Sequence, residues 1–555
     1  EFRIMKKIKN FVLASAAATL LLTGCAEDYQ SDFNVNKPES VALAETLNAY
    51  DVLKNYTGIH LGAEIASDDA LAQNALYSQV LANFNEVTLS DAFSYAGMVA
   101  DNGDIDTLTV EKAVANAANS GMNVFATAMF NPAQFNVNYM KELTKDTWVE
   151  GTQVDTDIVE DFEKYDAGSK LDGDGFSVIA KDPAGQNGKV FSNTKNAKFM
   201  SIPIQLPEGA KLKDVQSISF DYRSSNIKKI LLLRVKAGES IAEKQFDKPE
   251  AKDQWAHYEL SMTSLADNIT AEDMEANTFS IMVGQGATPQ KVYVDNIKLH
   301  VAYKTEGYYV DRPAAEKAAD VKKGLDAYAD ALVEKYGDRI GVWTVASNLL
   351  DDFLGEMKST DITGDPSEFY PNDYLGDNYV ADVCKTIHAA KPDMKLFYEE
   401  SNMLGNDMKQ EGMKNYLAQW NEAGAQIAGV NIKVDLPYQA AILEDTKAQY
   451  ETLLNSLKET GLLVRLSDLN VYPADKSGAI QGISQVTTAQ LKEMASFYTY
   501  IVNKYLEIIP ENQRYGLSFS HVNASNVGVG LWSNYNRLPT YVGVANGLQS
   551  KETTW

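Results

Sequence analysis

The sequence predicts an α/β protein, a (β/α)8 TIM barrel that is interrupted after its third strand by an all-β sandwich of the jelly-roll type. Strand-like runs alternate with helical segments over residues 46–150 and again over residues 304–555, and together they supply enough strands to close a barrel. Between them, residues 151–303 consist of short runs with period-two alternation, separated by Gly, Asp, Asn and Pro turns. That pattern indicates a β-sandwich.

Each flank of the insert has its own strands and helices. The expected strands are Thr57–Ile65, Glu86–Leu89 and Asn123–Phe130 before the insert, then Gly341–Ser347, Met394–Glu400, Ile427–Leu436, Leu462–Val471 and Tyr515–Val522 after it. Helices are expected over Val110–Asn119, after Pro313, and in a stretch that stops at Gly461. A continuous two-domain chain is the alternative, and it is less favoured because neither flank alone has enough strands to close a barrel.

The sandwich contributes candidate ligand-binding and metal-binding residues. Trp255 and Tyr222 are candidate platforms for a sugar ring, with core packing as the alternative, because alternation alone does not say which face of a strand is exposed. Glu163 near the first strand and Asp295 near the last are candidate ligands of a structural Ca²⁺, similar to those of jelly-roll carbohydrate-binding modules. The alternative is that these carboxylates are simply solvated. No other cofactor is expected.

The N-terminal segment predicts secretion and a lipid anchor. Basic residues that follow Met5 precede an apolar run, Phe11–Leu22, that is too short to span a bilayer, and this order is typical of a signal peptide over residues 1–24. The closing Leu-Thr-Gly-Cys resembles a bacterial lipobox, which implies that Cys25 is lipidated and that residues 25–45 are a tether. An ordinary cleaved signal is the alternative. The acidic start of the tether is similar to the surface-export signal of lipoproteins in glycan-degrading Gram-negative bacteria, which implies an exposed outer-membrane lipoprotein.

The composition excludes some partners. The chain of 555 residues has a formal net charge of −26, which argues against nucleic acid and anionic lipid surfaces as ligands. Its two cysteines, Cys25 and Cys384, leave no internal disulfide once Cys25 is acylated, and the five His residues form no metal-binding spacing. The composition suits a body that faces a neutral ligand.

Landmarks in both flanks resemble glycoside hydrolase family 10, the endo-xylanase family. They are Ile59-His60-Leu61-Gly62-Ala63, Asn85-Glu86-Val87-Thr88 and the late segment Leu531-Trp532-Ser533-Asn534-Tyr535-Asn536-Arg537-Leu538-Pro539-Thr540-Tyr541. The resemblance covers nearly all of residues 46–150 and 304–552, and an inserted sandwich is known among lipoprotein members of the family. By position, Trp532 is a candidate lining residue of the barrel mouth, with packing as the alternative.

The positions that match the family's catalytic residues are altered. The acid/base motif Trp-Asp-Val-Val-Asn-Glu is matched by Trp343-Thr344-Val345-Ala346-Ser347-Asn348, so Asn348 stands where the catalytic Glu is expected. The nucleophile motif Thr-Glu-Leu-Asp is matched by Ser467-Asp468-Leu469-Asn470, so the carboxylate is kept as the shorter Asp468. An amide gives no proton to a leaving oxygen, and general acid catalysis contributes about 10²–10⁴-fold. The resemblance therefore implies that hydrolysis has been lost.

Supporting positions differ as well. The family's residues on strands two, three, six and eight are matched by Asp91 and Ser94, by Ala126–Asn131, by Asp435, and by Ser520 or His521. Asp435 and Asp468 are candidates for a new carboxylate pair. The favoured alternative is that one of them is hydrogen-bonded structurally and the other faces solvent. Adjacent Glu399 and Glu400 point to opposite sides of their strand, so one at most faces the mouth, where a solvated rim charge is expected.

Three functions are compatible with these features. The favoured one is a surface glycan-binding lipoprotein with an inactive xylanase-like barrel that holds a xylan-like polysaccharide for uptake. The second is an active endo-1,4-β-xylanase-like hydrolase with a rearranged site. The third is an accessory lipoprotein of an outer-membrane glycan transporter.

Overall fold

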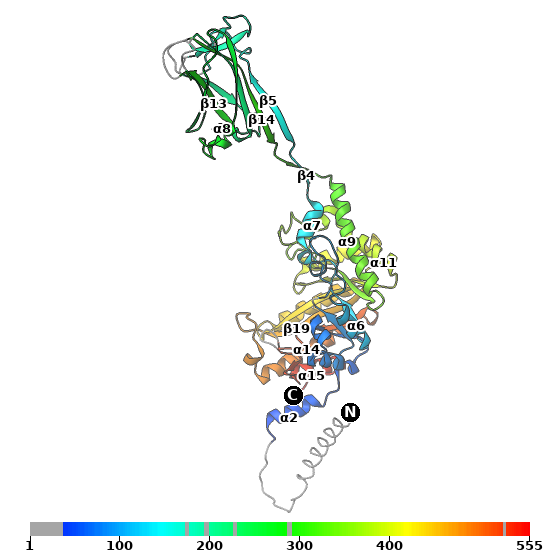
Figure 1. Ribbon diagram of the computed structural model, residues 1–555. Helices are drawn as coiled ribbons and strands as arrows, with labels where there is room; N and C mark the ends of the chain where they lie inside the picture. Colours follow the sequence, from blue (N-terminus) through cyan, green and yellow to red (C-terminus); the bar gives the residue numbers. More distant parts are fainter. Residues whose placement is uncertain are drawn as a thin grey trace, which may run out of the picture. The chain divides into compact units, whose positions relative to one another are not determined.

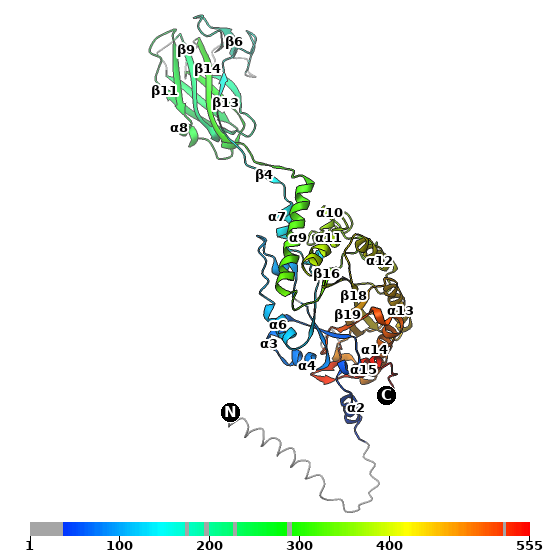
Figure 2. The same ribbon diagram turned by 90° about the vertical axis from the view of Figure 1, so that its right-hand side faces the viewer.

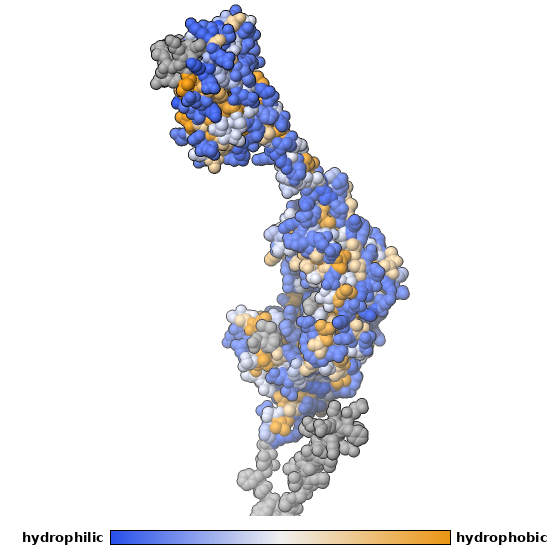
Figure 3. Space-filling model, in the orientation of Figure 1, coloured by the Kyte–Doolittle hydropathy of each residue, from blue (hydrophilic) through white to orange (hydrophobic). Residues whose placement is uncertain are grey.

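The computed structural model describes residues 37–90, 92–171, 177–193, 199–225, 230–285, 291–524 and 529–555. The chain divides into two compact units, one formed by Glu1–Thr144 with Ala314–Trp555 and the other by Lys145–Pro313. The predicted signal peptide, the tether up to residue 36 with Cys25, and Asp91 lie outside the described residues. On the face seen in Figure 3, hydrophilic residues cover most of both units, as expected from the strongly negative net charge.

The first unit is a closed barrel of eight parallel strands in the order β1-β2-β3-β16-β17-β18-β19-β20. Figures 1 and 2 show these strands inside a ring of helices. The predicted (β/α)8 barrel, and its interruption after the third strand, are therefore confirmed. The strands are β1 (His60–Ile65), β2 (Glu86–Leu89), β3 (Asn123–Ala126), β16 (Val342–Ser347), β17 (Lys395–Glu400), β18 (Gly429–Tyr438), β19 (Leu463–Pro473) and β20 (Arg514–Phe519).

Some strands end at other residues than predicted, because a strand ends where its hydrogen bonding to the neighbouring strand ends and not where the apolar residues end. The predicted third strand ran to Phe130, but β3 ends at Ala126 and the following apolar residues pack in the core. β18 and β19 extend further than expected, because they stay paired up to Tyr438 and Pro473. In β19 one extra residue between Ser467 and Asn470 shifts the register against β18, which marks a β-bulge at Asp468.

Helices cover the outside of the barrel. The long α9 (Ala314–Tyr336) buries the five apolar residues that recur at helical spacing, Val321, Leu325, Tyr328, Leu332 and Tyr336. The other helices of this unit are α2 (Glu39–Asn48), α3 (Ser67–Ala72), α4 (Ala75–Asn83), α5 (Tyr95–Met98), α6 (Glu111–Asn119), α7 (Val137–Thr144), α10 (Asn372–Leu375), α11 (Tyr379–Ala390), α12 (Asp407–Glu422), α13 (Leu443–Glu459), α14 (Thr488–Ile508) and α15 (Pro539–Leu548). Within the described ranges, no helix combines the length and apolar character needed to cross a membrane.

The second unit is a sandwich of two antiparallel sheets. One sheet has the order β11-β10-β13-β8, and the other has the order β12-β9-β14-β7-β6 with β5 also paired to β14. Side chains from both sheets meet in one apolar core. The strands are β5 (Gln153–Glu160), β6 (Ser177–Lys181), β7 (Lys189–Asn193), β8 (Phe199–Gln205), β9 (Val215–Ser224), β10 (Leu231–Ala237), β11 (Ser240–Phe246), β12 (Trp255–Ser261), β13 (Thr278–Gln285) and β14 (Val292–Lys304), with the short helix α8 (Thr263–Ala266) beside them.

A separate two-stranded ribbon joins the chain segments that enter and leave the sandwich. β4 (Thr147–Val149) and β15 (Tyr308–Val310) pair antiparallel, with Trp148 directly opposite Tyr309. The pairing continues through two threonines, because Thr305 donates its backbone N–H to the carbonyl of Thr152 at 3.0 Å.

Candidate functional site

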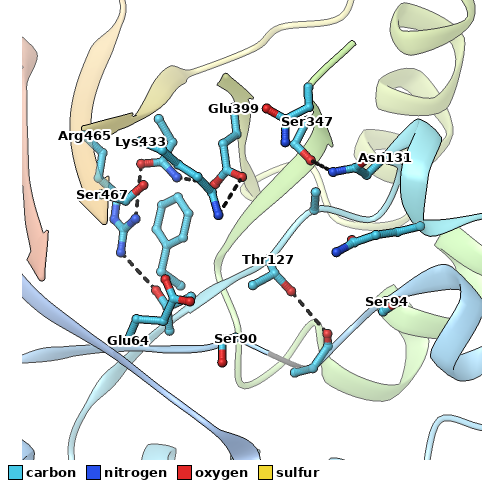
Figure 4. Close-up of a pocket in the computed structure, with 17 residues that line it drawn as sticks. Glu64, Ser90, Ser94, Thr127, Asn131, Ser347, Glu399, Lys433, Arg465 and Ser467 are labelled. Carbon is cyan, nitrogen blue, oxygen red and sulfur yellow. Dashed lines mark hydrogen bonds and ion pairs between the residues drawn. The ribbon is translucent and has the colours of Figure 1, made fainter. Parts of the chain in front are cut away.

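A polar cavity lies at the carboxyl ends of the barrel strands, where barrel enzymes carry their sites. It encloses about 130 Å³, and Figure 4 shows side chains from several strands converging on it. Its lining is dominated by hydroxyl, amide and charged groups: Glu64, Thr88, Ser90, Ala92, Ser94, Phe125, Thr127, Ala128, Asn131, Gln134, Ser347, Asn348, Glu399, Asn431, Lys433, Arg465 and Ser467. We call this space the inner cavity.

The base of the inner cavity is an ordered polar network around Arg465, whose side chain is almost completely buried. The Arg465 guanidinium donates to Glu86 Oε1 at 2.9 Å, to Thr88 Oγ1 at 3.0 Å and to Asn431 Oδ1 at 3.2 Å. Its charged carbon also stacks 3.9 Å from the centre of the Phe125 ring. Every part of the guanidinium is thus fixed by β2, β3 or β18, which gives the cavity a rigid floor.

Lys433 of β18 stands above this floor between two carboxylates. Its Nζ atom is 3.1 Å from Asp468 Oδ2 and 3.7 Å from Glu399 Oε1. Burial opposes the charged form of Lys433, but the carboxylates of Glu399, Asp468 and Glu64 outweigh it and raise the pKa of the lysine. Asn431 donates to Glu399 Oε2 at 2.5 Å. The Lys433 ammonium is therefore, beside the Arg465 guanidinium, a permanent positive charge of the mouth.

Glu64, at the end of β1, forms a carboxyl–carboxylate pair with Asp468 of β19. Burial, reinforced by the hydrogen bond to Asp468 and by its negative charge, raises the pKa of Glu64 to about 8. Burial also disfavours the charge on Asp468, but the hydrogen bond from Glu64 and the Lys433 ammonium lower the pKa of Asp468. At neutral pH Glu64 therefore holds the shared proton and donates it to the Asp468 carboxylate.

This pair makes the stability of the barrel sensitive to alkaline pH. The folded state holds the Glu64 proton up to about pH 8, whereas an unfolded glutamate releases it near its ordinary pKa of 4.5. The contribution is thus complete below pH 4.5 and is lost as the pH rises through about 8. Between pH 6 and pH 9 we expect the free energy of unfolding to fall by about 2–3 kcal/mol, measured by urea denaturation. Glu64→Gln, whose amide is a permanent donor, should flatten this dependence, and an unchanged slope would contradict the shared proton.

Asn348 and Ser347, at the end of β16, are held by neighbouring polar groups. Ser401 donates its hydroxyl to Asn348 Oδ1 at 2.8 Å, and Asn131 donates to Ser347 Oγ at 2.9 Å. The Asn348 backbone has φ of +52° and the Asp468 backbone +49°, in the left-handed region that short polar residues tolerate best. At Asp468 this turn coincides with the β-bulge, and the carboxylate lies beside the Lys433 ammonium.

A second hollow adjoins the inner cavity on the β1, β19 and β20 side. It measures about 410 Å³, and both Asp435 and Asp468 line it, together with Ser520 and His521. Asn470 donates to Asp435 Oδ1 at 3.3 Å. Burial raises the pKa of Asp435, which the Asn470 contact opposes and the Asp468 charge reinforces. The two carboxylates considered from the sequence thus share one hollow, which we call the outer hollow.

The structure corrects the expectation for Glu399 and Glu400. They do point to opposite sides of β17, but neither is a solvated rim charge. Glu399 lies in the inner cavity, and its side chain is only 12% exposed. Glu400 is completely buried and pairs with Lys409 at 2.8 Å. Sequence position alone could not reveal these cationic partners, which come from β18 and α12.

Two of the three candidate aromatic platforms are core residues. Tyr222 is fully buried because its side of β9 faces the opposing sheet. Trp532 is 2% exposed and packs edge-on against Tyr541 in the barrel core, so it does not line the mouth. Trp255 is partly exposed on the edge strand β12, and its indole N–H lies 3.3 Å from the Asp182 carboxylate. Of the three, only Trp255 remains available to a ligand.

Sequence reasoning missed the three charged residues that organise the mouth, Glu64, Lys433 and Arg465. Each lies within a barrel strand, in the runs Gly62-Ala63-Glu64, Lys433-Val434-Asp435 and Arg465-Leu466-Ser467. A charge inside an otherwise apolar strand was the available signal, since a barrel interior requires each such charge to have a partner.

In the sandwich, Asp295 is buried and its Oδ1 atom has no hydrogen-bond partner among the described residues. Burial, together with the nearby carboxylates of Asp221, Asp161 and Glu163, raises the pKa of Asp295 to about 7. Glu163 accepts the backbone N–H of Lys189 at 2.6 Å. Across the described ranges, no group of three or more His, Cys, Asp or Glu side chains is arranged to hold a metal ion.

Comparison with known proteins relates the barrel to xylanases. A family model described as glycosyl hydrolase family 10 matches residues 304–517. Endo-beta-1,4-xylanase Xyn10C of Cellvibrio japonicus is 25% identical over 270 residues, which cover 43% of this chain and 42% of the relative. Endo-1,4-beta-xylanase A of Cellvibrio japonicus (strain Ueda107) is 23% identical over 265 residues, covering 44% of this chain and 43% of the relative. The match therefore spans less than half of the length of these curated relatives.

Solved structures share the fold. A GH10 endoxylanase from a sugarcane soil metagenome aligns with a TM-score of 0.51 at 10% identity, covering 90% of this chain and 100% of that chain. Xylanase B from Clostridium stercorarium F9 aligns with a TM-score of 0.50 at 11% identity, with the same coverage. At such identities the likeness establishes the fold and leaves the chemistry to the residues of the site.

Proposed function

Residues 304–517 match the family model of glycosyl hydrolase family 10, and on that premise we propose that this chain is a surface lipoprotein that binds a xylan-type polysaccharide without hydrolysing it. The inner cavity presents many hydroxyl and amide groups, which suit the hydroxyls of a neutral sugar. The net charge of −26 is compatible with such a ligand and not with a polyanion.

The arrangement of the carboxyl groups carries the proposal that hydrolysis is lost. A retaining glycosidase holds two carboxyls about 5–5.5 Å apart, and an inverting one holds them about 6.5–9.5 Å apart, on either side of the scissile bond. Glu64 and Asp468 are hydrogen-bonded to each other instead, so no glycosidic bond fits between them. At the acid/base position, Asn348 offers an amide that cannot supply a proton.

One experiment separates the three candidate functions. The full chain in detergent is incubated with soluble xylans, and two quantities are measured: released reducing ends, and retardation of the protein in xylan-containing affinity gels. We expect retardation without release. Release that disappears in Asp468→Asn would establish the hydrolase instead, whereas neither release nor retardation across a panel of glycans would favour the transporter accessory.

The proposed location rests on Cys25. A lipid on this residue would hold the body at the outer membrane, with a glycan transporter as a candidate neighbour. Cys25→Ala should move the protein from the membrane fraction to the soluble fraction of the producing cells. Cys384→Ala is the matched control, because that thiol is buried in the barrel core and should leave the distribution unchanged. Equal distributions of the two variants would refute the anchor.

The sandwich is proposed to contribute to binding through Trp255. Trp255 lies opposite Arg223, and Arg223 lies opposite Tyr293, so these three side chains follow one another across the outer face of one sheet. We expect Trp255→Ala to weaken gel retardation about threefold to tenfold, because one aromatic stacking contact is worth about 0.5–1.5 kcal/mol. Tyr308→Ala is the control, since this exposed aromatic residue lies on the separate ribbon. Equal effects of both variants would contradict a specific role for Trp255.

A structural calcium ion in the sandwich belongs to the same proposal. The unpartnered oxygen of Asp295 is a suitable ligand, with Glu163, backbone carbonyls and water completing the shell after local adjustment. Saturating Ca²⁺ should then raise the free energy of unfolding of the sandwich by about 1–3 kcal/mol relative to EDTA, followed by calorimetry. Asp295→Asn should abolish the response to Ca²⁺. A wild-type protein that melts identically in both buffers would show that the carboxylate is only a buried acid.

A further inference from the structure

Building on the proposed glycan binding, we infer that the inner cavity takes one terminal sugar ring of a glycan chain, and that the Glu64–Asp468 pair closes it off from the outer hollow. An open cleft would instead hold an internal stretch of the chain. The size of this cavity, its boundary and one unsatisfied hydroxyl group in its lining point to the end of a glycan chain.

The boundary is formed by the carboxyl pair. Glu64 and Ser90 line both the inner cavity and the outer hollow, whereas Asp468 lines only the outer hollow, and Lys433 only the inner cavity. β1 and β19 are both neighbours of β20, so Glu64 and Asp468 come from strands on either side of that strand. Lys433 holds the Asp468 end of the pair from the inner side. The mouth is thereby divided in two.

The volume of the inner cavity fits a single ring. It encloses about 130 Å³, close to the cavity of about 150 Å³ that holds one benzene molecule in another protein. The outer hollow is larger and less enclosed. A sugar inside a chain continues at both ends and needs two exits, whereas a terminal sugar needs one. The enclosed and divided space therefore favours a chain end.

The lining contains a buried hydroxyl group that a ligand could provide with a hydrogen bond. Ser467 is 4% exposed, lines the inner cavity, and its Oγ atom has no hydrogen-bond partner within the part of the chain that the structure describes. Figure 4 shows Ser467 beside Arg465 and Lys433, on the side of the cavity opposite Asn131 and Ser347. A buried hydroxyl without a partner is costly, and a sugar hydroxyl in the cavity would satisfy it.

The test compares xylo-oligosaccharides of increasing length. The full chain in detergent is titrated by calorimetry with xylobiose, xylotetraose and xylohexaose at equal molar concentrations. A pocket for a chain end predicts dissociation constants that agree within about twofold, because only one end of each molecule binds. Affinity that rises about threefold or more with each added pair of sugars would overturn the inference, since every additional subsite adds binding energy.

Two serine variants locate the ring. Ser467→Ala should weaken xylotetraose binding about twofold to tenfold while the unfolding midpoint stays unchanged, because no protein hydrogen bond is lost. Ser520→Ala, in the outer hollow, is the matched control and should bind normally. The reverse result would place the ring in the outer hollow and overturn the inference.

A third variant tests the partition itself. Glu64→Ala removes the carboxyl that divides the mouth, so the affinity of this variant should increase with oligosaccharide length. Length-dependent binding already present in the wild type, together with retention in xylan gels, would overturn the chain-end inference while glycan binding stands. A protein that binds neither oligosaccharides nor polymer would overturn both.

Discussion

Replacing Arg465 with Met is expected to lower the free energy of unfolding of the barrel by about 3–5 kcal/mol. The substitution leaves the Glu86 carboxylate buried without its cation, since Glu86 is 1% exposed and lies 2.9 Å from the arginine Nε. It also removes the hydrogen bonds to Thr88 and Asn431 and the stacking on Phe125. Guanidinium denaturation monitored by near-UV circular dichroism measures the loss.

The double variant Arg465→Met/Glu86→Leu distinguishes an unpaired charge from lost packing. Removing both partners of a buried ion pair is often nearly neutral, so the double variant should recover most of the lost stability. Tyr515 and Asn123, which donate to Glu86 at 2.8 Å each, would then lose an acceptor, so complete recovery is not expected. A single variant that costs less than about 1 kcal/mol would show that the Glu86 charge is not stabilised by this pair.

Replacing Lys409 with Met should cost a similar amount, about 3–5 kcal/mol. Lys409 is 1% exposed, and its ammonium lies 2.8 Å from the fully buried Glu400 and 2.6 Å from Asp352. It also donates to the backbone carbonyl of Ser401 at 2.9 Å. Because Ser401 in turn holds Asn348 at the mouth, we expect weaker retention in xylan gels as well as a lower free energy of unfolding.

Lys414→Met is the matched control on the same helix. Its ammonium pairs with the exposed carboxylates of Glu411 and Glu459 at 2.9 Å and 3.0 Å. Exposed pairs of this kind contribute about 0–1 kcal/mol, so the control should unfold and bind almost as the wild type does. If the free energy of unfolding fell by similar amounts in both variants, the loss of any charge on α12 would be destabilising. The burial of Lys409 would then not explain its effect.

The barrel was predictable from the sequence because its signals are local. Strand–helix alternation, the helix ends at glycine and the period-two runs of the insert each depend on a few neighbouring residues. The exact strand ends were less predictable, because pairing with a neighbouring strand decides them. β3 ends at Ala126 although the apolar run continues to Phe130.

The site was predictable only in part. Asn348 and Asp468 could be placed from motif positions, but the proton shared by Glu64 and Asp468 depends on a bulge that shifts the register of β19 by one residue. No local pattern reports such a shift. Tyr222 illustrates the same limit, because alternation defines two faces of a strand and only the opposing sheet decides which face is buried.

The ribbon of β4 and β15 bears on how this architecture arose. Because the two connecting segments are hydrogen-bonded to each other, with Tyr308 opposite Val149 and Val310 opposite Thr147, the chain leaves and re-enters the barrel at adjacent points. In the barrel, the whole of Lys145–Pro313 then takes the place of one short hairpin. The entropy cost of closing so long a loop therefore does not lower the stability of the barrel. A module joined in this way can be gained, lost or exchanged during evolution while the eight strands keep their order.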